Sequence, residues 1–146
     1  MLRFTLTVLL FLPLAPVRTD RAKDQPSDAD KLQGTWQVVA FETPEAKLTP
    51  DQLRDYAKLT IKGSEYTWST GGKGSFKLDP VKNPKAVDYL AGPADANPPV
   101  RAAIYEFIDA DTFRDCMAPA GMPRPTEFST PPGSGQLLLV YRRVRD

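Results

Sequence analysis

Fifteen prolines, against nine glycines, are spread along this chain of 146 residues and limit its fold more than any other feature. Proline lacks a backbone N–H and its ring clashes with the preceding turn of a helix, so it interrupts helices and central strands. Long helices therefore have little room here, and short strands joined by structured loops are expected. The proportions of apolar and charged residues, 41% and 25%, are those of an ordinary globular domain with one core.

The N-terminal stretch MLRFTLTVLLFLPLAP carries one arginine and then an apolar run over residues 4–12, which a proline ends. Such a run is too short to span a bilayer and is typical of a secretory signal. We expect a signal peptide and the start of a linker over residues 1–22, more linker over 23–28, and one domain over 29–146. An uncleaved membrane anchor is the alternative. The domain is then exported, to the periplasm, the cell envelope or the medium, without stable membrane insertion after cleavage.

The charge of that domain argues against nucleic acid as a partner. Removing residues 1–22 takes three arginines and one aspartate from 19 basic and 18 acidic residues, which leaves a net charge of −1. A near-neutral domain lacks the excess of positive charge that binds nucleic acid. The expected partners are a small apolar molecule or an envelope protein, and we expect a monomer.

Residue types that are missing narrow the chemistry further. The chain has no histidine, the usual general base at neutral pH, and Cys116 is its one cysteine, so neither a disulfide within the chain nor a cysteine-rich zinc site can form. No serine stands in a Ser-x-x-Lys or Gly-x-Ser-x-Gly context. Asp109 and Asp111 are interpreted as turn chemistry rather than metal ligands. We expect no enzyme, no cofactor and no metal, and a partly buried Cys116 that forms no covalent dimer.

Two helix starts can be recognised. Asp28 or Asp30 can cap a single helical turn. A helix is expected over residues 50–57, because Thr49 is a favourable cap and the following proline and glutamine complete a capping box. We expect no other helix of any length.

Alternation of apolar and polar residues predicts eight strands, in which successive side chains face opposite ways. In the first strand this places Trp36, Val38 and Ala40 on one face and Phe41 on the other. The expected strands cover residues 34–41, 59–62, 66–69, 75–78, 86–90, 100–108, 113–117 and 136–144. Short connections favour an all-β, up-and-down antiparallel barrel, since closure removes exposed strand edges, with an open two-sheet sandwich as the alternative. Eight strands enclose room for packed side chains or one small ligand.

The segment DKLQGTWQVVAFE, with its Gly-Thr-Trp, resembles the start of a lipocalin. Together with LTIKGSEYTWSTGGKGSFKLDP, NPKAVD, IYEFIDADTF and RPTEFSTPPGSGQLLLVYRR, it makes residues 29–146 similar to the planctomycete-type lipocalin-like domain family. That family is exported or appended to larger proteins, and its function is uncharacterised. The resemblance implies a lipocalin-like barrel in which Arg142 or Arg143 stacks on Trp36 at the base.

The chain departs from this family at two positions. Ala110 replaces a turn glycine, which implies a strained positive φ there. Asp115 replaces an aliphatic residue on the face of Phe113, and a carboxylate in an apolar interior costs several kcal/mol unless it is partnered or protonated. We expect a bulge to turn Asp115 to solvent. The alternative is a basic partner, Arg101 or Arg142.

The candidate ligand-binding residues are aromatic. Tyr66, Trp68, Phe76 and Tyr105 are expected inside the barrel, as packed core or as the wall of a cavity for a flat apolar ligand, with Asp115 as a polar anchor if it faces inward. Two functions remain open: non-covalent binding of a small apolar molecule, and a structural or protein-interaction domain with a filled barrel.

The loop over residues 118–135 is stiffened by prolines. Phe128 is expected to fold inward over one barrel end. The loop is then either a structural plug, or a lid or partner-binding loop with Arg124 and Glu127 as its polar contacts.

Overall fold

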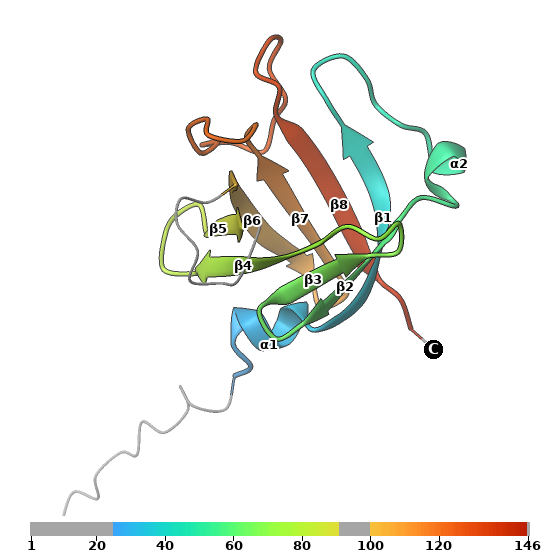
Figure 1. The fold of residues 1–146 in the computed structure, drawn as a ribbon, viewed down its shortest axis with the longest axis vertical. Coiled ribbons are helices and arrows are strands. Elements are labelled where there is room, and N and C mark those ends of the chain that lie inside the picture. Colours follow the sequence, from blue (N-terminus) through green and yellow to red (C-terminus); the bar gives the residue numbers. More distant parts are fainter. Residues whose placement is uncertain (1–24, 91–99, 146) are drawn as a thin grey trace, which may run out of the picture.

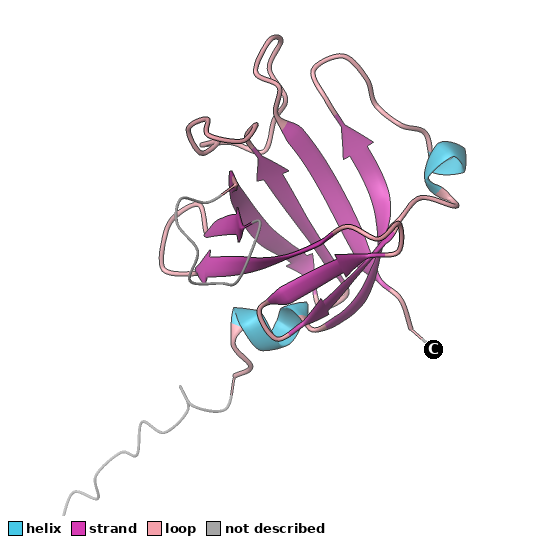
Figure 2. Ribbon diagram, in the orientation of Figure 1, coloured by secondary structure: helices cyan, strands magenta, loops and turns pink. Residues whose placement is uncertain are grey.

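The computed structural model describes residues 25–90 and 100–145. The signal peptide expected over residues 1–22 lies outside them. Eight antiparallel strands pair in sequence order, and the pairing of β8 with β1 closes the barrel (Figures 1 and 2). The elements are α1 (Asp28–Leu32), β1 (Gly34–Glu42), α2 (Pro50–Leu53), β2 (Lys58–Lys62), β3 (Glu65–Trp68), β4 (Lys73–Asp79), β5 (Ala86–Leu90), β6 (Arg101–Asp109), β7 (Thr112–Met117) and β8 (Leu137–Arg143). The up-and-down barrel is confirmed, and the open sandwich is excluded.

Both helices are short and begin with capping boxes. Ser27, rather than either aspartate, caps α1, through bonds shared with Asp30. Thr49 caps α2 as expected, but the helix ends at Leu53, four residues before the expected end. A side chain of β1, Gln37, donates to the carbonyls of Leu53 and Tyr56 and so satisfies groups that a longer helix would use. No helix in the described ranges is long and apolar enough to cross a membrane.

A β-bulge in β1 changes which side chains face the interior. The register with β8 shifts between Val38 and Ala40. Because a bulge inserts one extra residue, the alternation reverses beyond it. Phe41 therefore faces the barrel interior, where it packs against Tyr56 with ring centroids 5.8 Å apart. The expectation that Phe41 faces away from Trp36 and Val38 is wrong.

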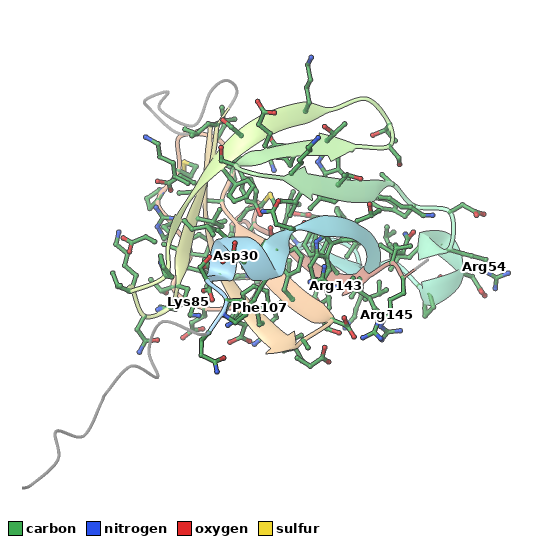
Figure 3. The ribbon with its side chains drawn as sticks, turned by 90° about the horizontal axis from the view of Figure 1, so that it is seen from below. Asp30, Arg54, Lys85, Phe107, Arg143 and Arg145 are labelled. Carbon is green, nitrogen blue, oxygen red and sulfur yellow. The ribbon has the colours of Figure 1, made fainter. Side chains whose placement is uncertain are left out.

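The barrel end beside α1 is closed by a stacked tryptophan and arginine. Trp36 is fully buried, and the guanidinium carbon of Arg143 lies 4.1 Å from its ring centroid. The Arg143 guanidinium also donates to the Lys31 and Gln33 carbonyls at the end of α1, so a single side chain joins β8 to the helix. Figure 3 shows α1 lying across this end of the barrel with Arg143 beside it. Of the two expected arginines, Arg142 points to solvent.

A second contact between α1 and the barrel involves Asp28, which was expected to be linker. Its buried carboxylate accepts hydrogen bonds from Lys85 at 2.7 Å and from the Tyr105 hydroxyl at 2.8 Å. Burial disfavours the ionised carboxylate, but these two bonds and the charges of Lys85 and Lys31 outweigh it, so the pKa of Asp28 is lowered. The folded unit thus includes Ser27 and Asp28.

The proline-rich loop lies along the outer wall of the barrel and does not cap its end. Arg124 donates to the carbonyls of Val87 and Ala103, at 2.8 and 2.6 Å, and pairs with Asp88. The Phe128 ring packs under the guanidinium of Arg114, on the outward face of β7, at 4.2 Å from its centroid. The inward plug and the lid are therefore wrong descriptions of this loop.

The outer face of β7 is buried by the same loop. Cys116 is fully buried rather than partly, and its thiol donates to the Ser129 carbonyl across 3.3 Å. Burial raises the pKa of this thiol. A second buried layer therefore lies outside the barrel wall, separate from the core inside it.

Candidate ligand-binding site

The interior of the barrel is divided into a packed half and a hollow half. Near α1 the side chains leave a void of about 20 Å³, room for no more than about one water molecule. At the opposite end, where β1, β3, β5 and β7 finish, there is a cavity of about 620 Å³. We call it the aromatic cavity; its lining comprises Phe41, Asp55, Tyr56, Ala57, Leu59, Tyr66, Trp68, Thr70, Tyr89, Arg101, Met117, Leu137, Leu139 and Tyr141. Its volume lies within the range of small-molecule sites.

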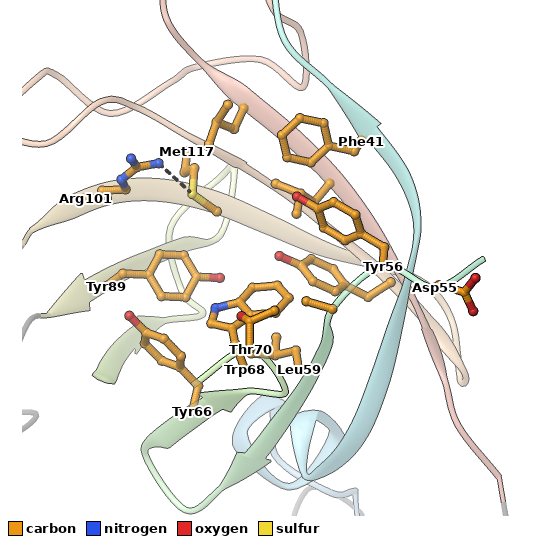
Figure 4. A pocket seen from close by; sticks show the side chains of 14 residues that line it. Phe41, Asp55, Tyr56, Leu59, Tyr66, Trp68, Thr70, Tyr89, Arg101 and Met117 are labelled. Atoms are coloured by element: carbon orange, nitrogen blue, oxygen red, sulfur yellow. Dashed lines mark hydrogen bonds between the residues drawn. The ribbon is translucent and has the colours of Figure 1, made fainter. Parts of the chain in front are cut away.

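Aromatic rings from several strands form its wall (Figure 4). Tyr66 and Trp68 alternate on β3, so both point inward. The Tyr66 ring meets Tyr89 of β5 edge to face at 5.7 Å, and Trp68 meets Tyr141 of β8 at 6.4 Å. These contacts hold the rings in place without filling the space between them.

A glycine on the neighbouring strand makes room for Tyr66. A Cβ on Gly74 would lie 2.5 Å from the Tyr66 hydroxyl and 2.7 Å from the Leu90 carbonyl oxygen. Since real Cβ atoms do not approach other atoms so closely, any other residue at this position would displace the tyrosine ring. Gly74 is thus part of the shape of the aromatic cavity.

A buried carboxyl group adjoins the cavity wall. Asp115 is 0% exposed and faces inward from β7, as simple alternation from Phe113 requires. The hydroxyl of Tyr89 donates to its Oδ2, and the hydroxyl of Tyr141 approaches the same atom at 3.5 Å. Oδ1 has no hydrogen-bond partner within the described part of the chain. Burial raises the pKa of Asp115 to about 7, against the opposing effect of the bonds from Tyr89 and Tyr141.

Three expectations about this strand and the turn before it are wrong. Asp115 does not turn to solvent, because the bulge next to the turn lies on β6, between Phe107 and Asp109, and leaves the register of β7 with β8 unbroken. Neither proposed arginine reaches the carboxyl group; tyrosine hydroxyls do. Ala110 is not strained, since no described residue other than glycine has a positive φ. The turn is supported instead by the Asp111 N–H, which donates to Asp109 Oδ1 at 2.8 Å.

One cationic side chain lies at the rim of the cavity. Arg101, at the start of β6, directs Nη1 to the Met117 sulfur at 3.6 Å, a weak contact (Figure 4). No ion pair joins Arg101 to a carboxylate in the described ranges. Burial raises the pKa of Tyr66, and the positive charge of Arg101 opposes that rise. Asp55 is exposed at another part of the rim.

The structure separates the residues that were grouped as candidates. Tyr66 and Trp68 line the aromatic cavity, whereas Phe76 and Tyr105 belong to the packed half. Among the loop residues, Arg124 and Phe128 bind the outer wall, and Glu127 is exposed.

Several lining residues were missed. Tyr89 and Tyr141 lie on strands that were correctly located, so alternation along those strands could have identified them. Phe41 depends on the bulge, and Tyr56 on the early end of α2, and neither leaves a clear signal in the sequence.

Fold and site together define a small antiparallel β-barrel domain with one end closed and an aromatic cavity at the other. The described residues hold no group of three or more cysteine, aspartate or glutamate side chains placed to bind a metal ion. Comparison with known proteins found no match: no family model, no curated protein and no solved structure is significantly similar to the chain.

Proposed function

We propose that this protein binds a small, mostly apolar molecule non-covalently in the aromatic cavity. The observation that carries the proposal is the 620 Å³ of space in a barrel whose other half is packed to a void of about 20 Å³. A domain that needed only a core would gain by filling this space, because unfilled apolar volume costs stability. The rings supply flat apolar surface, and the tyrosine hydroxyls supply orientation.

The wider role proposed is that of an exported, lipocalin-like binding domain rather than an enzyme. Support comes from the apolar N-terminal run of the sequence, the Gly-Thr-Trp segment, and an up-and-down barrel with an arginine stacked on a tryptophan at its closed end. A monomer fits this role, since the barrel leaves no strand edge unpaired.

A second candidate function is a structural or protein-interaction domain of the cell envelope. The packed half of the barrel and the outer layer beneath the loop favour it, because both stabilise the fold without any ligand. The partner would then be an envelope protein.

Titration with a neutral fluorescent probe separates the two functions. Nile red is expected to gain fluorescence on binding, and the signal is expected to saturate. Leu137→Trp, which fills the cavity from β8, should weaken binding at least about tenfold, since a ring occupies the space the probe needs. Leu138→Trp, the neighbouring residue on the outer face, is the control and should bind normally.

Circular dichroism and thermal unfolding should show that both variants remain folded. Absence of saturable binding to the wild-type protein, or equal loss in both folded variants, would contradict the ligand-binding function and favour the structural one.

A further inference from the structure

We propose that the ligand of the aromatic cavity is an organic cation, an amine on an apolar body, whose ammonium group is received by Asp115 between Tyr89 and Tyr141. This rests on the proposed function, because it names the chemical class of molecule that the cavity takes. Three features carry it: the aromatic wall, the unsatisfied oxygen of the carboxyl group, and the position of Arg101.

The wall provides the first feature. Six of the lining residues carry aromatic rings, namely Phe41, Tyr56, Tyr66, Trp68, Tyr89 and Tyr141. The face of an aromatic ring is electronegative, and a cation that has lost its water is attracted to such faces. A cavity enclosed by several rings therefore favours an ammonium group more than it favours an anion.

Asp115 provides the second feature. A buried carboxyl oxygen without a donor is costly, and nearly all such atoms in proteins have a partner. Oδ1 has no partner among the residues that the structure describes, and the Tyr141 hydroxyl holds Oδ2 only loosely at 3.5 Å. Asp115 is not itself a lining residue, but its partners Tyr89 and Tyr141 are. An ammonium group carries several donors on one atom, so one that displaces the loose Tyr141 bond can satisfy the carboxyl group in its place.

Among the described residues, no cation near Asp115 already donates to its carboxyl group. Tyr89 and Tyr141 bond to it, the Tyr105 hydroxyl is turned to Asp28, and Tyr56 and Tyr66 are near enough to affect Tyr141. Cys116 faces outward from the same strand. Arg101 is the one lining arginine, and its weak contact with Met117 keeps it at the rim. An anionic ligand held by Arg101 would leave Oδ1 unsatisfied.

The test uses three probes that share one ring system and differ in charge: naphthylethylamine, naphthylethanol and naphthylacetate. Calorimetric titration near pH 8 is expected to show the amine binding at least about tenfold more tightly than the alcohol, the scale of a charge-assisted hydrogen bond. Asp115→Asn should remove this preference while the alcohol still binds. Glu65→Gln, on the outward face of β3 and outside the cavity, is the matched control and should keep the preference.

A second measurement needs no variant, in case Asp115→Asn fails to fold. Because the ammonium group requires an ionised Asp115, amine affinity should rise about tenfold between pH 6 and pH 8, while the affinity for the alcohol stays constant. An anion would do the reverse and bind more weakly as the carboxyl group ionises.

Three outcomes would overturn the inference. If naphthylacetate binds most tightly and Arg101→Gln abolishes that binding, the site takes anions through Arg101, and small-molecule binding itself stands. If the amine and the alcohol bind equally, with no effect of pH, the carboxyl group does not select the ligand. If none of the probes binds and Nile red does not bind either, the proposed function fails together with the inference.

Discussion

At the scale of single residues, Asp115 shows how a polar side chain can be accommodated in an apolar barrel. Two tyrosine hydroxyls, from β5 and β8, meet on one of its oxygens, and burial favours the protonated form. The residue therefore changes its charge near neutral pH, far above the ordinary value of 3.8. This makes the stability of the whole domain depend on pH through one carboxyl group.

The expected effect of Asp115→Asn follows from the direction of that shift. Between about pH 4 and pH 7 the folded state holds a proton that the unfolded state has lost, so stability is full below pH 4 and decreases as pH rises to 7. Wild-type protein should lose about 3 kcal/mol of unfolding free energy between pH 5 and pH 8, and the asparagine variant should lose much less of it. Urea unfolding at both pH values measures this. If the unfolding free energy of the wild type changed with pH as little as that of the variant, Asp115 would be ionised in the folded state at little cost.

At the scale of elements, the loop over residues 118–136 acts as a clamp on the outer wall. Its three charge-assisted bonds from Arg124 reach β5 and β6, and Pro125 is buried beside them. The clamp buries the outer face of β7, including Cys116, which a bare barrel would expose to solvent.

Arg124→Leu should destabilise the domain by about 2 kcal/mol, because hydrogen bonds to charged groups typically contribute 1.5–3 kcal/mol and Asp88 loses its partner. It should also expose the Cys116 thiol, so that a thiol reagent labels the native variant faster than the wild type. Arg54→Leu is the control, since its pair with Asp51 is exposed on α2, and a change below about 0.5 kcal/mol is expected. A comparable loss in both variants would show that the clamp contributes nothing specific.

Most of the elements could be predicted from the sequence because they depend on local patterns. Alternation located all eight strands, and the capping box located the start of α2. The bulge at Val38 and Ala40 was not predictable, since it inserts a residue into β1 without a proline or a glycine to mark it. Its consequence, Phe41 in the cavity wall, was missed with it.

The environment of Asp115 could not be predicted, for a different reason. Alternation from Phe113 predicts correctly that Asp115 faces inward. The cost of burying a charge led instead to the prediction that it faces solvent. The compensation comes from Tyr89 and Tyr141, which lie 26 residues away on either side and reach the carboxyl group only once the barrel has closed. Long-range pairing of this kind has no signature in one sequence.

At the scale of the whole molecule, stability is concentrated at the end covered by α1. Arg143 joins β8 to the helix, and Asp28 joins the helix to Lys85 and Tyr105. These contacts link the first and last elements of the barrel, so the closed end should be the last part to open.

Lys85→Met tests the contribution of Asp28. The lowered pKa of Asp28 stabilises the fold above about pH 4, and this contribution is lost as pH falls through the folded value. The variant should be about 1 kcal/mol less stable at neutral pH and should lose less stability on acidification. Lys82→Met, whose pair with Asp79 is exposed, is the control and should behave as wild type. If the Lys85 variant lost as much stability on acidification as the wild type, the role assigned to the Lys85–Asp28 pair would be contradicted.

The division of the barrel into a packed and a hollow half bears on how such a domain can diversify. Substitutions at separated sites that share no partners act almost independently on stability. The contacts of Arg143 and Asp28 that close the barrel lie at the α1 end. Leu59, Tyr66 and Tyr89 border both halves, whereas Phe41, Tyr56 and Arg101 border the cavity and not the packed half. Selection can therefore exchange the side chains that border the cavity alone, and so alter what the domain holds, while the contacts at the α1 end continue to specify the same barrel.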